Sequence, residues 1–372
     1  MGGSGFSVYY KGSKVVDIWG GYADNEARRP WKEDTISLVW STTKGIAAIC
    51  MATLVDRGLL DYDKTVASYW PEFGQNGKEN VTVRMLLGHQ AGLSYTSEVI
   101  NLDLLADQDA LGQVLARSPP MWEPGTAHGY HALTFGLYLS QLLRRVDPKH
   151  RTLGQYFKEE IAEPFDADFQ IGLPLESFHR VARVQGSGNN LILNLINGMK
   201  SPFNRQLLWS MMFEEIDLDK VLETSGDMIA PGAALRPETL VLEQPSAFGV
   251  GTARAVAKVY GILSNGGVST EGQRLMSSAL IDTFLSEAEA PFRDRTMGSN
   301  LTVNLGFFVD TVQGWQSFGH PGAGGMHGLA FPERKLGLGY VSSYNSPFGT
   351  GDDPRYLSLR DATFKCIDDL EA

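Results

Sequence analysis

A serine and a lysine stand three residues apart, as Ser41 and Lys44, at the start of a long apolar stretch. Positions i and i+3 of an α-helix lie on the same face, so the hydroxyl and the amine could share a hydrogen bond. The amine could then accept the serine proton. The free N–H groups and the positive dipole end at a helix N-terminus favour an oxyanion and disfavour a protonated lysine. The spacing therefore indicates a nucleophilic serine that forms a covalent acyl intermediate.

The same two residues also have a purely structural interpretation. Ser41 could cap a helix while Lys44 is solvated, and one Ser-x-x-Lys motif is expected by chance in a chain of this length. No other Ser-x-x-Lys motif occurs among the 372 residues. The two interpretations are separated by whether the remaining parts of an acyl-transfer site are present.

Residues 45–55 predict the helix that would carry these groups. From residue 46 to residue 55 the stretch is apolar all round, and it ends at an Asp-Arg-Gly sequence at residues 56–58. It is much shorter than the roughly 20 apolar residues that cross a bilayer. The pattern is typical of a helix at the centre of a domain, so a serine at its start would lie at the base of a cleft.

Tyr130 follows a turn sequence, Trp-Glu-Pro-Gly at residues 122–125, and precedes an apolar helical stretch that starts near residue 132. This position predicts a loop that enters a helix. A phenol there could face the serine, be ionised next to a lysine or histidine, and pass a proton to the leaving group. The alternative is a tyrosine packed in the core with its hydroxyl hydrogen-bonded, which the local sequence alone favours.

A second candidate segment is the glycine-rich sequence Phe-Gly-His-Pro-Gly-Ala-Gly-Gly at residues 318–325. Glycines at this density let a ligand or another backbone approach closely, and they suit an oxyanion hole built from backbone N–H groups. His320 would then point into the cleft. A structural histidine is an equally good interpretation.

Composition narrows the class of partner. The net charge is −11 and the sequence pI is about 5.2, and no basic run appears, which argues against nucleic-acid or anionic-membrane binding and indicates a small-molecule partner. Cys50 and Cys366 are too few for a disulfide scaffold or a cysteine zinc site. No spaced His/Cys cluster or other metal motif is present, so we expect neither metal nor cofactor.

No signal peptide is visible, which predicts a cytoplasmic protein unless an N-terminal segment is missing.

Strand-like segments occur at both ends of the chain, and residues 65–245 are mainly helical and loop-rich. Residues 6–10 and 15–19 predict a hairpin, and further strands are predicted at residues 305–309, 316–319, 328–331 and 336–342, before a final helix at 354–370. This order predicts an α/β fold, an antiparallel sheet flanked by helices with an inserted helical lobe and a cleft between them. The expected domains are residues 1–65 with 246–372, and residues 66–245.

In these features the chain resembles the serine β-lactamase and penicillin-binding-protein superfamily. Within it, the resemblance is to the class C β-lactamase-like group, which includes family VIII carboxylesterases and animal β-lactamase-domain proteins. Motifs in the family's order cover most of the chain, at residues 41–45, 59–66, 83–93, 124–125, 130, 251–254 and 320–322. The resemblance implies a β-lactamase/transpeptidase-like fold.

The resemblance also implies roles for individual residues. Ser41 would be the acylated nucleophile, Lys44 the proton acceptor, and Tyr130 a general acid and base. His320 falls where β-lactamases carry the lysine of a Lys-Thr-Gly triad, and we expect it to be catalytic. The backbone N–H of Ala323 would join that of Ser41 in the oxyanion hole.

Two further residues are expected to bind substrate, Trp122 and Gly322. The inserted lobe supplies large apolar side chains for an acyl pocket if they face the cleft, although ordinary core packing is the better interpretation for most of them individually. These side chains, with the tryptophan that precedes the serine, are Trp40, Phe203, Trp209, Met211, Met212 and Phe213.

Two departures from the family pattern bear on the substrate. Tyr130, His131 and Ala132 stand where β-lactamases have Tyr-x-Asn, and His320 and Pro321 replace the lysine and threonine that help to hold a β-lactam carboxylate. An ester needs a nucleophile, a proton shuttle and an oxyanion hole, but no carboxylate anchor. We therefore expect an ester hydrolase or acyltransferase. The alternatives are a β-lactamase or D-amino-acid peptidase, or a non-catalytic structural or assembly protein.

A third departure concerns the start of the chain. The family usually has a helix before the first hairpin, packed on the sheet beside the C-terminal helix, whereas here the hairpin begins almost at Met1. We expect one sheet face to be partly uncovered, with reduced stability or a homo-oligomeric contact.

Overall fold

The computed structural model describes residues 2–185, 196–213, 216–229, 232–348 and 351–372. Its main feature is a seven-stranded antiparallel sheet in the order β10-β11-β12-β13-β14-β1-β2. The strands are β1 (Ser4–Tyr10), β2 (Ser13–Gly20), β10 (Val303–Asn304), β11 (Phe307–Val312), β12 (Trp315–Gly322), β13 (Met326–Phe331) and β14 (Leu336–Ser342). Since β1 pairs with β14, both ends of the chain build one sheet, and the predicted fold class is confirmed.

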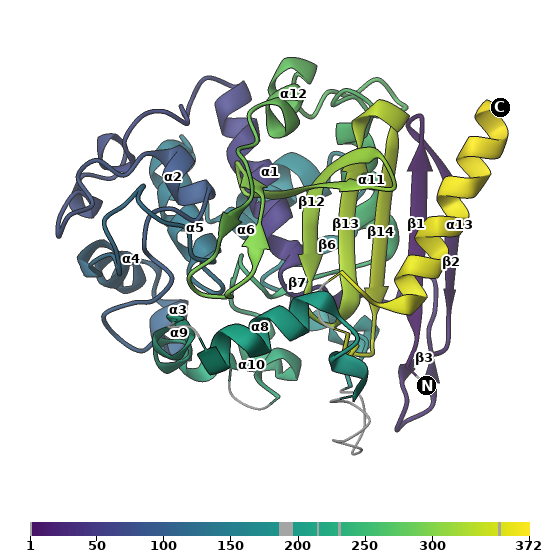
Figure 1. Cartoon of the computed structure of the whole chain (residues 1–372), viewed down its shortest axis with the longest axis horizontal. Coiled ribbons are helices and arrows are strands. Elements are labelled where there is room, and N and C mark those ends of the chain that lie inside the picture. The colour runs from purple at the N-terminus through teal and green to yellow at the C-terminus, as the bar shows by residue number, and fades with distance from the viewer. Residues whose placement is uncertain (1, 186–195, 214–215, 230–231, 349–350) are drawn as a thin grey trace.

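The predicted N-terminal hairpin is also confirmed. Strands β1 and β2 are joined by Lys11 and Gly12, which both have positive φ, at 50° and 81°. A two-residue turn with two positive φ values twists in the same sense as the strands that it joins. The hairpin therefore brings β2 to one edge of the sheet, at the right of Figure 1.

Helix α1 (Thr42–Asp56) lies between the sheet and the helical part of the chain (Figure 1). Its residues from Thr42 to Leu54 are all buried. It packs against β12 on one side and against α5 (Phe135–Val146) and α6 (Leu153–Phe157) on the other. The predicted central helix is therefore present, and Ser41 is its N-cap residue.

The two faces of the sheet are covered by different helices. Helix α11 (Ala253–Ser264), capped by Thr252, packs on β14 and β1 on the same side as α1. Gly337 and Gly339 of β14 permit this packing, because a side chain at either would overlap the α11 backbone. On the opposite face, α13 (Pro354–Glu371) contributes Phe364 to an apolar cluster with Trp315 and other sheet residues.

The remaining helices and strands are short. The helices are α2 (Val83–Leu87), α3 (Leu102–Ala106), α4 (Gln108–Arg117), a π-helical turn (Lys158–Ala162), α8 (Pro202–Phe213), α9 (Leu218–Thr224), α10 (Pro237–Leu240) and α12 (Ser278–Ser286). The small sheets join β5 (Ser37–Leu38), β7 (Gly249–Gly251) and β6 (Phe169–Ile171), β3 (Tyr22–Asp24) with β4 (Arg29–Pro30), and β8 (Phe292–Arg293) with β9 (Asn300–Leu301).

Helices α3 and α4 are separated by the single residue Asp107. Asp107 has an extended backbone conformation and caps α4 by accepting hydrogen bonds from the backbone N–H groups of Asp109 and Ala110. An aspartate side chain competes in this way with helix continuation.

None of the helices in the described parts of the chain is both long and apolar enough to cross a membrane.

The Gly45→Ala substitution tests how tightly α1 is packed. Alanine normally stabilises a helix interior by about 1 kcal/mol relative to glycine. Here the added Cβ would overlap Tyr260 Oη and lie 3.2 Å from His320 Cβ. We expect a net loss of about 1–3 kcal/mol in unfolding free energy, measured by urea denaturation.

The double variant Gly45→Ala/Tyr260→Phe provides the control. Removal of the tyrosine hydroxyl should restore part of the lost stability, as a non-additive coupling between neighbours. A stabilised Gly45→Ala single variant would contradict the packing described here.

Candidate active site

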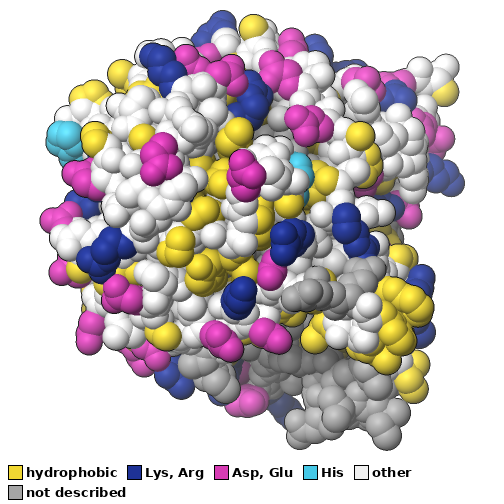
Figure 2. Space-filling view, turned by 60° about the vertical axis from the view of Figure 1, so that its left-hand side comes forward, with side chains coloured by type: hydrophobic (Ala, Val, Ile, Leu, Met, Phe, Trp, Pro, Cys, Tyr) yellow, Lys and Arg dark blue, Asp and Glu magenta, His cyan; other side chains and the backbone are white. Residues whose placement is uncertain are grey.

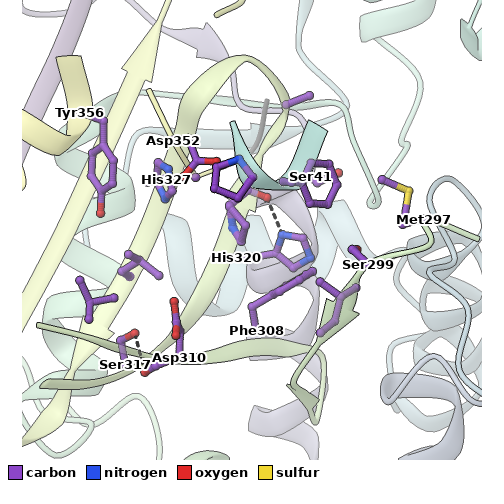
Figure 3. A pocket seen from close by; sticks show the side chains of 18 of the residues that line it. Ser41, Met297, Ser299, Phe308, Asp310, Ser317, His320, His327, Asp352 and Tyr356 are labelled. Atoms are coloured by element: carbon purple, nitrogen blue, oxygen red, sulfur yellow. Dashed lines mark hydrogen bonds between the residues drawn. The ribbon is translucent and has the colours of Figure 1, made fainter. Parts of the chain in front are cut away.

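A cavity of about 1300 Å³ brings together Ser41, Tyr130, His320 and Ala323. Figure 3 shows His320 next to Phe308 at one end of the cavity, with His327 and Tyr356 farther along it. Four of the seven predicted site residues therefore line one space. Among the described residues, the other three, Lys44, Trp122 and Gly322, are not part of its lining.

Lys44 is completely buried directly behind the serine. Its Nζ lies 3.3 Å from Ser41 Oγ and donates hydrogen bonds to the carbonyl oxygens of Ala132, at 2.6 Å, and Ser246, at 2.8 Å. Burial holds the pKa of the amine well below its ordinary value. A neutral amine has two N–H bonds and one lone pair, so two carbonyls use both N–H bonds and the lone pair remains for the Ser41 hydroxyl proton.

The backbone immediately before the serine is in an unusual conformation. Trp40 has φ of 49°, in the left-handed region that non-glycine residues rarely adopt. Its indole Nε1 donates a hydrogen bond to Asn345 Oδ1 at 3.1 Å. The backbone N–H groups of Thr42 and Thr43 bond to the carbonyls of Val39 and Trp40 and continue the turn into α1. This bend directs the chain into the helix with Ser41 at the cavity wall, and such strain is typical of functional sites.

Tyr130 lies on a loop before α5, in contact with both Ser41 and Lys44. The Lys44 Nζ lies 4.7 Å from the centre of its ring, and its hydroxyl lies 3.5 Å from His320 Nε2. Burial raises the pKa of the phenol, while a hydrogen bond with Ser41 opposes that shift. The resting phenol is therefore neutral and not the ionised form that the sequence suggested, so it can donate a proton.

His320 is buried and neutral. Its Nδ1 lies 2.7 Å from the carbonyl oxygen of Pro321, which can only accept, so Nδ1 carries the proton and Nε2 presents its lone pair to Tyr130. Burial and the nearby Lys44 lower the pKa of the imidazole. The position that holds a lysine in β-lactamases thus carries no charge here. Of the described lining residues, only Arg360, on α13, is cationic.

Gly322 is the last residue of β12, and Ala323 directly follows it. A side chain at Gly322 would overlap the Val39 carbonyl oxygen, so this glycine lets β12 approach the segment before Ser41. Ala323 lines the cavity and opens a short turn in which Gly324 and Gly325 have positive φ. The geometry gives Gly322 a positioning role and brings Ala323 to the cavity.

Trp122 lies under the loop that carries Tyr130. Its indole Nε1 donates to the Ala127 carbonyl at 3.0 Å, and its ring packs against Gly129, where no side chain would fit. The guanidinium of Arg295 lies 5.2 Å from the ring centre on the other side. The tryptophan therefore supports the tyrosine loop from below.

The sequence analysis missed two buried histidines beside the tyrosine. His131 Nε2 accepts a hydrogen bond from the backbone N–H of Leu93, so its Nδ1 carries the proton and donates to His89 Nδ1 at 3.2 Å. The His89 ring packs 4.9 Å from the ring of Tyr130. These histidines connect the residue 83–93 motif to the tyrosine loop. His89 lies in the residue 83–93 motif and His131 directly follows Tyr130, but the contact between them depends on tertiary structure.

Asp294 is a second residue that the sequence did not reveal. Its Oδ1 accepts hydrogen bonds from the backbone N–H groups of Thr296 and Met297, while Oδ2 is buried and has no hydrogen-bond partner within 3.5 Å among the described residues. The next residue, Arg295, donates from its backbone to the His128 carbonyl. Burial raises the pKa of the Asp294 carboxyl to about 6. This carboxyl joins the Tyr130 loop to the cavity wall that contains Met297.

The Asp294→Asn substitution should stabilise the protein in a pH-dependent way. The carboxyl titrates near pH 6 when folded, against an ordinary value of 3.8, so the folded state binds more protons between these values and wild-type stability falls as pH rises. An amide keeps the Oδ1 acceptor and has no charge. We expect a gain of about 1–3 kcal/mol at pH 7.5 and little change at pH 4, measured by denaturant titration. An equal effect at both pH values would contradict the assignment.

The Lys44 geometry predicts the sign of the pH dependence of acylation. With the neutral Lys44 amine as the proposed base, kcat/KM for a non-ionising ester should fall about tenfold per pH unit below the Lys44 pKa and be constant above it. This fall in kcat/KM should occur at pH values well below the ordinary range of lysine titration, because burial lowers the pKa of Lys44. Stopped-flow burst kinetics across the pH range would measure it. A fall in kcat/KM that occurs within the ordinary range of lysine titration would contradict a neutral resting amine.

Comparisons with known proteins identify the family. The family model described as Beta-lactamase matches residues 1–361. The esterase/beta-lactamase LipL of Mycobacterium tuberculosis is 37% identical over 351 residues, which cover 92% of this chain and 77% of LipL.

Solved structures agree with this match. The crystal structure of a family VIII carboxylesterase has a TM-score of 0.84 and 35% identity, covering 98% of this chain and 92% of its own. EstA from Arthrobacter nitroguajacolicus Rue61a has a TM-score of 0.81 and 28% identity, covering 100% and 93%. The chain therefore belongs to the Beta-lactamase family and is a serine hydrolase of its esterase-like members.

Proposed function

We propose that the protein hydrolyses esters, or transfers their acyl groups to alcohols, through an acyl-enzyme on Ser41. The observation that carries the proposal is the buried Lys44 amine, whose N–H bonds are both used by carbonyl oxygens and whose lone pair is left for the serine proton. Such an arrangement activates a hydroxyl without a histidine base.

In the acylation step, Ser41 Oγ attacks the ester carbonyl carbon while its proton passes to Lys44 Nζ. The carbonyl oxygen becomes an oxyanion, which the backbone N–H groups of Ser41 and Ala323 would stabilise. When the tetrahedral intermediate collapses, the bond to the alcohol oxygen breaks. Tyr130, which is neutral and protonated, donates a proton to that oxygen and recovers one from Lys44.

Deacylation reverses these roles. Water or an alcohol attacks the acyl carbon, its proton passes through Tyr130 to Lys44, and Ser41 leaves with a proton returned to Oγ. Because His320 Nε2 accepts from the Tyr130 hydroxyl, the histidine orients the phenol in both steps. No cofactor or metal enters this scheme.

The uncharged His320 favours an ester over a β-lactam or a peptide that ends in a carboxylate. Such substrates place a carboxylate near this strand and need a cation there, whereas an ester does not. The names of the esterase/beta-lactamase LipL and the family VIII carboxylesterase support the same choice. β-Lactamase or D-amino-acid peptidase activity is the alternative, and D-amino acid amidase from Ochrobactrum anthropi shares the fold at 17% identity.

The partner in this proposal is a small ester or amide. A cytoplasmic location and a homo-oligomeric assembly belong to the same set of proposals, and cell fractionation and light scattering would test them.

Replacement of the nucleophile tests the proposal. Ser41→Ala should lower kcat/KM for p-nitrophenyl butyrate by at least about 10⁴-fold, while the cavity-lining control Ser317→Ala should stay within a few fold of wild type. Wild-type turnover of nitrocefin should be far below that of the ester. Equal ester activity in Ser41→Ala would overturn the proposal, and nitrocefin turnover equal to that of the ester would favour the β-lactamase alternative.

A fluorophosphonate probe separates an enzyme from a non-catalytic assembly protein. The probe should label wild-type protein and not Ser41→Ala. Unlabelled, folded wild-type protein would support the non-catalytic alternative.

A further inference from the structure

Hydrophobic side chains are not all buried in this protein, and Figure 2 shows them gathered across the middle of one face with charged side chains around them. One helix exposes an unusual number of them. In α8, large apolar side chains are 38–64% exposed. These residues, called the α8 apolar face below, are Leu208, Trp209, Met211, Met212 and Phe213.

Helix α8 turns its apolar side outward, whereas an ordinary surface helix turns it toward the core. Arg205, Leu208, Trp209 and Met212 recur at the i, i+3, i+4 and i+7 positions of one helix face, and all four are exposed. On the opposite face, the one fully buried residue is Ser210. A surface helix normally turns its apolar stripe toward the core, so core packing does not explain this stripe.

Polar contacts hold α8 to the rest of the protein. Ser210 Oγ donates to the Gly298 carbonyl at 2.9 Å and accepts from Arg293 at 2.8 Å. At the other end of the helix, Asn204 Nδ2 donates to the Pro347 carbonyl at 2.9 Å. These contacts fix which side of the helix faces the protein. The apolar side is therefore turned outward by specific hydrogen bonds.

The same helix is part of the wall of the catalytic cavity. Phe203, Asn204 and Gln206 line the cavity that contains Ser41. From the sequence, Trp209, Met211, Met212 and Phe213 were candidates for an acyl pocket if they faced the cleft. They are absent from the described lining and lie on the outer side of the helix. A substrate held against the outer side of α8 would thus lie beside the cavity wall.

Charge distinguishes this segment from the rest of the chain. The protein has 43 acidic residues and a net charge of −11, yet residues 177–213 contain no aspartate or glutamate. They contain Arg180, Arg183, Lys200 and Arg205. Arg180 and Arg183 form ion pairs with Asp168 and Glu26, whereas Lys200 and Arg205 are exposed and form no ion pair with another described residue. A surface bearing phosphate groups would meet no carboxylate repulsion from this segment.

We propose that the α8 apolar face docks the protein on a lipid–water interface, and that its substrates are esters held in that interface. The inference rests on the proposed esterase function and deepens it by naming the substrate class. An aromatic and aliphatic stripe next to basic residues is the pattern of helices that lie in the plane of a lipid surface. The Trp209 and Phe213 rings, 4.4 Å apart, supply the large apolar area.

The area of the face argues against a second copy of the chain as its occupant. The five side chains expose roughly 600 Å² in total, on the scale of 150–250 Å² for a fully exposed aromatic side chain. Stable protein interfaces bury about 800 Å² on each partner. A lipid surface needs no matching shape and accepts a smaller patch.

Binding and turnover can be measured separately. We would measure flotation of the protein with phosphatidylcholine vesicles in the Ser41→Ala background, where no turnover occurs. The variant Trp209→Gln/Met212→Gln/Phe213→Gln should bind at least about tenfold less than its parent. The matched control is Ile18→Gln/Trp19→Gln on β2, where the side chains are 50% and 41% exposed, and its binding should not change.

Turnover of two substrates completes the test. With Ser41 intact, the triple α8 variant should keep its kcat/KM for soluble p-nitrophenyl acetate within about twofold and lose about tenfold on an emulsified long-chain ester. Loss on both substrates would show a damaged site and would overturn the docking role. Three other results would also overturn the docking role. They are wild-type protein that does not float with the vesicles, equal flotation of all variants, and an oligomer that the α8 substitutions dissociate. Failure of the esterase proposal leaves a different result, flotation without any ester turnover.

Discussion

The buried Lys44 amine is the interaction on which the rest of the site depends. A lysine with no solvent contact is costly to charge, and the fold places two carbonyl oxygens where they bind the amine in its neutral form. One carbonyl comes from Ala132 in the loop after the tyrosine, and the other comes from Ser246, 202 residues farther along the chain than Lys44. The protein must therefore be fully folded before the serine has its base.

The packing around α1 maintains this arrangement. Tyr260 of α11 reaches across to Gly45, so α11, on the same side of the sheet, directly limits where α1 can lie. On the other side, the paired histidines His89 and His131 and the carboxyl of Asp294 hold the loop that contains Tyr130. Most of these groups are uncharged. Neutral groups around a neutral amine avoid the larger electrostatic cost of isolated buried charges.

The sequence predicted the parts of this site that depend on local periodicity and on motif order. Ser41 and Lys44 are one helical turn apart, and that spacing alone places them together. The hairpin at β1 and β2 and the cap at Thr252 follow from turn and capping chemistry. The partners of Lys44, the tautomer of His320 and the role of Trp122 could not be predicted, because each depends on a backbone atom brought from a distant segment. The outward orientation of α8 was missed for the same reason, because a stripe of apolar residues does not show which side of the helix faces the core.

The most direct test of the account is the ionisation state of Lys44 itself. Protein labelled with ¹³C at lysine Cε can be titrated by NMR, and the Lys44 signal assigned by its loss in Lys44→Arg. Burial also lowers the pKa of Lys78, to about 8, so the assignment must separate the two. The account predicts a Lys44 signal that titrates well below the ordinary lysine range, because burial lowers the pKa of this amine. A Lys44 signal that titrates in the ordinary lysine range would contradict it.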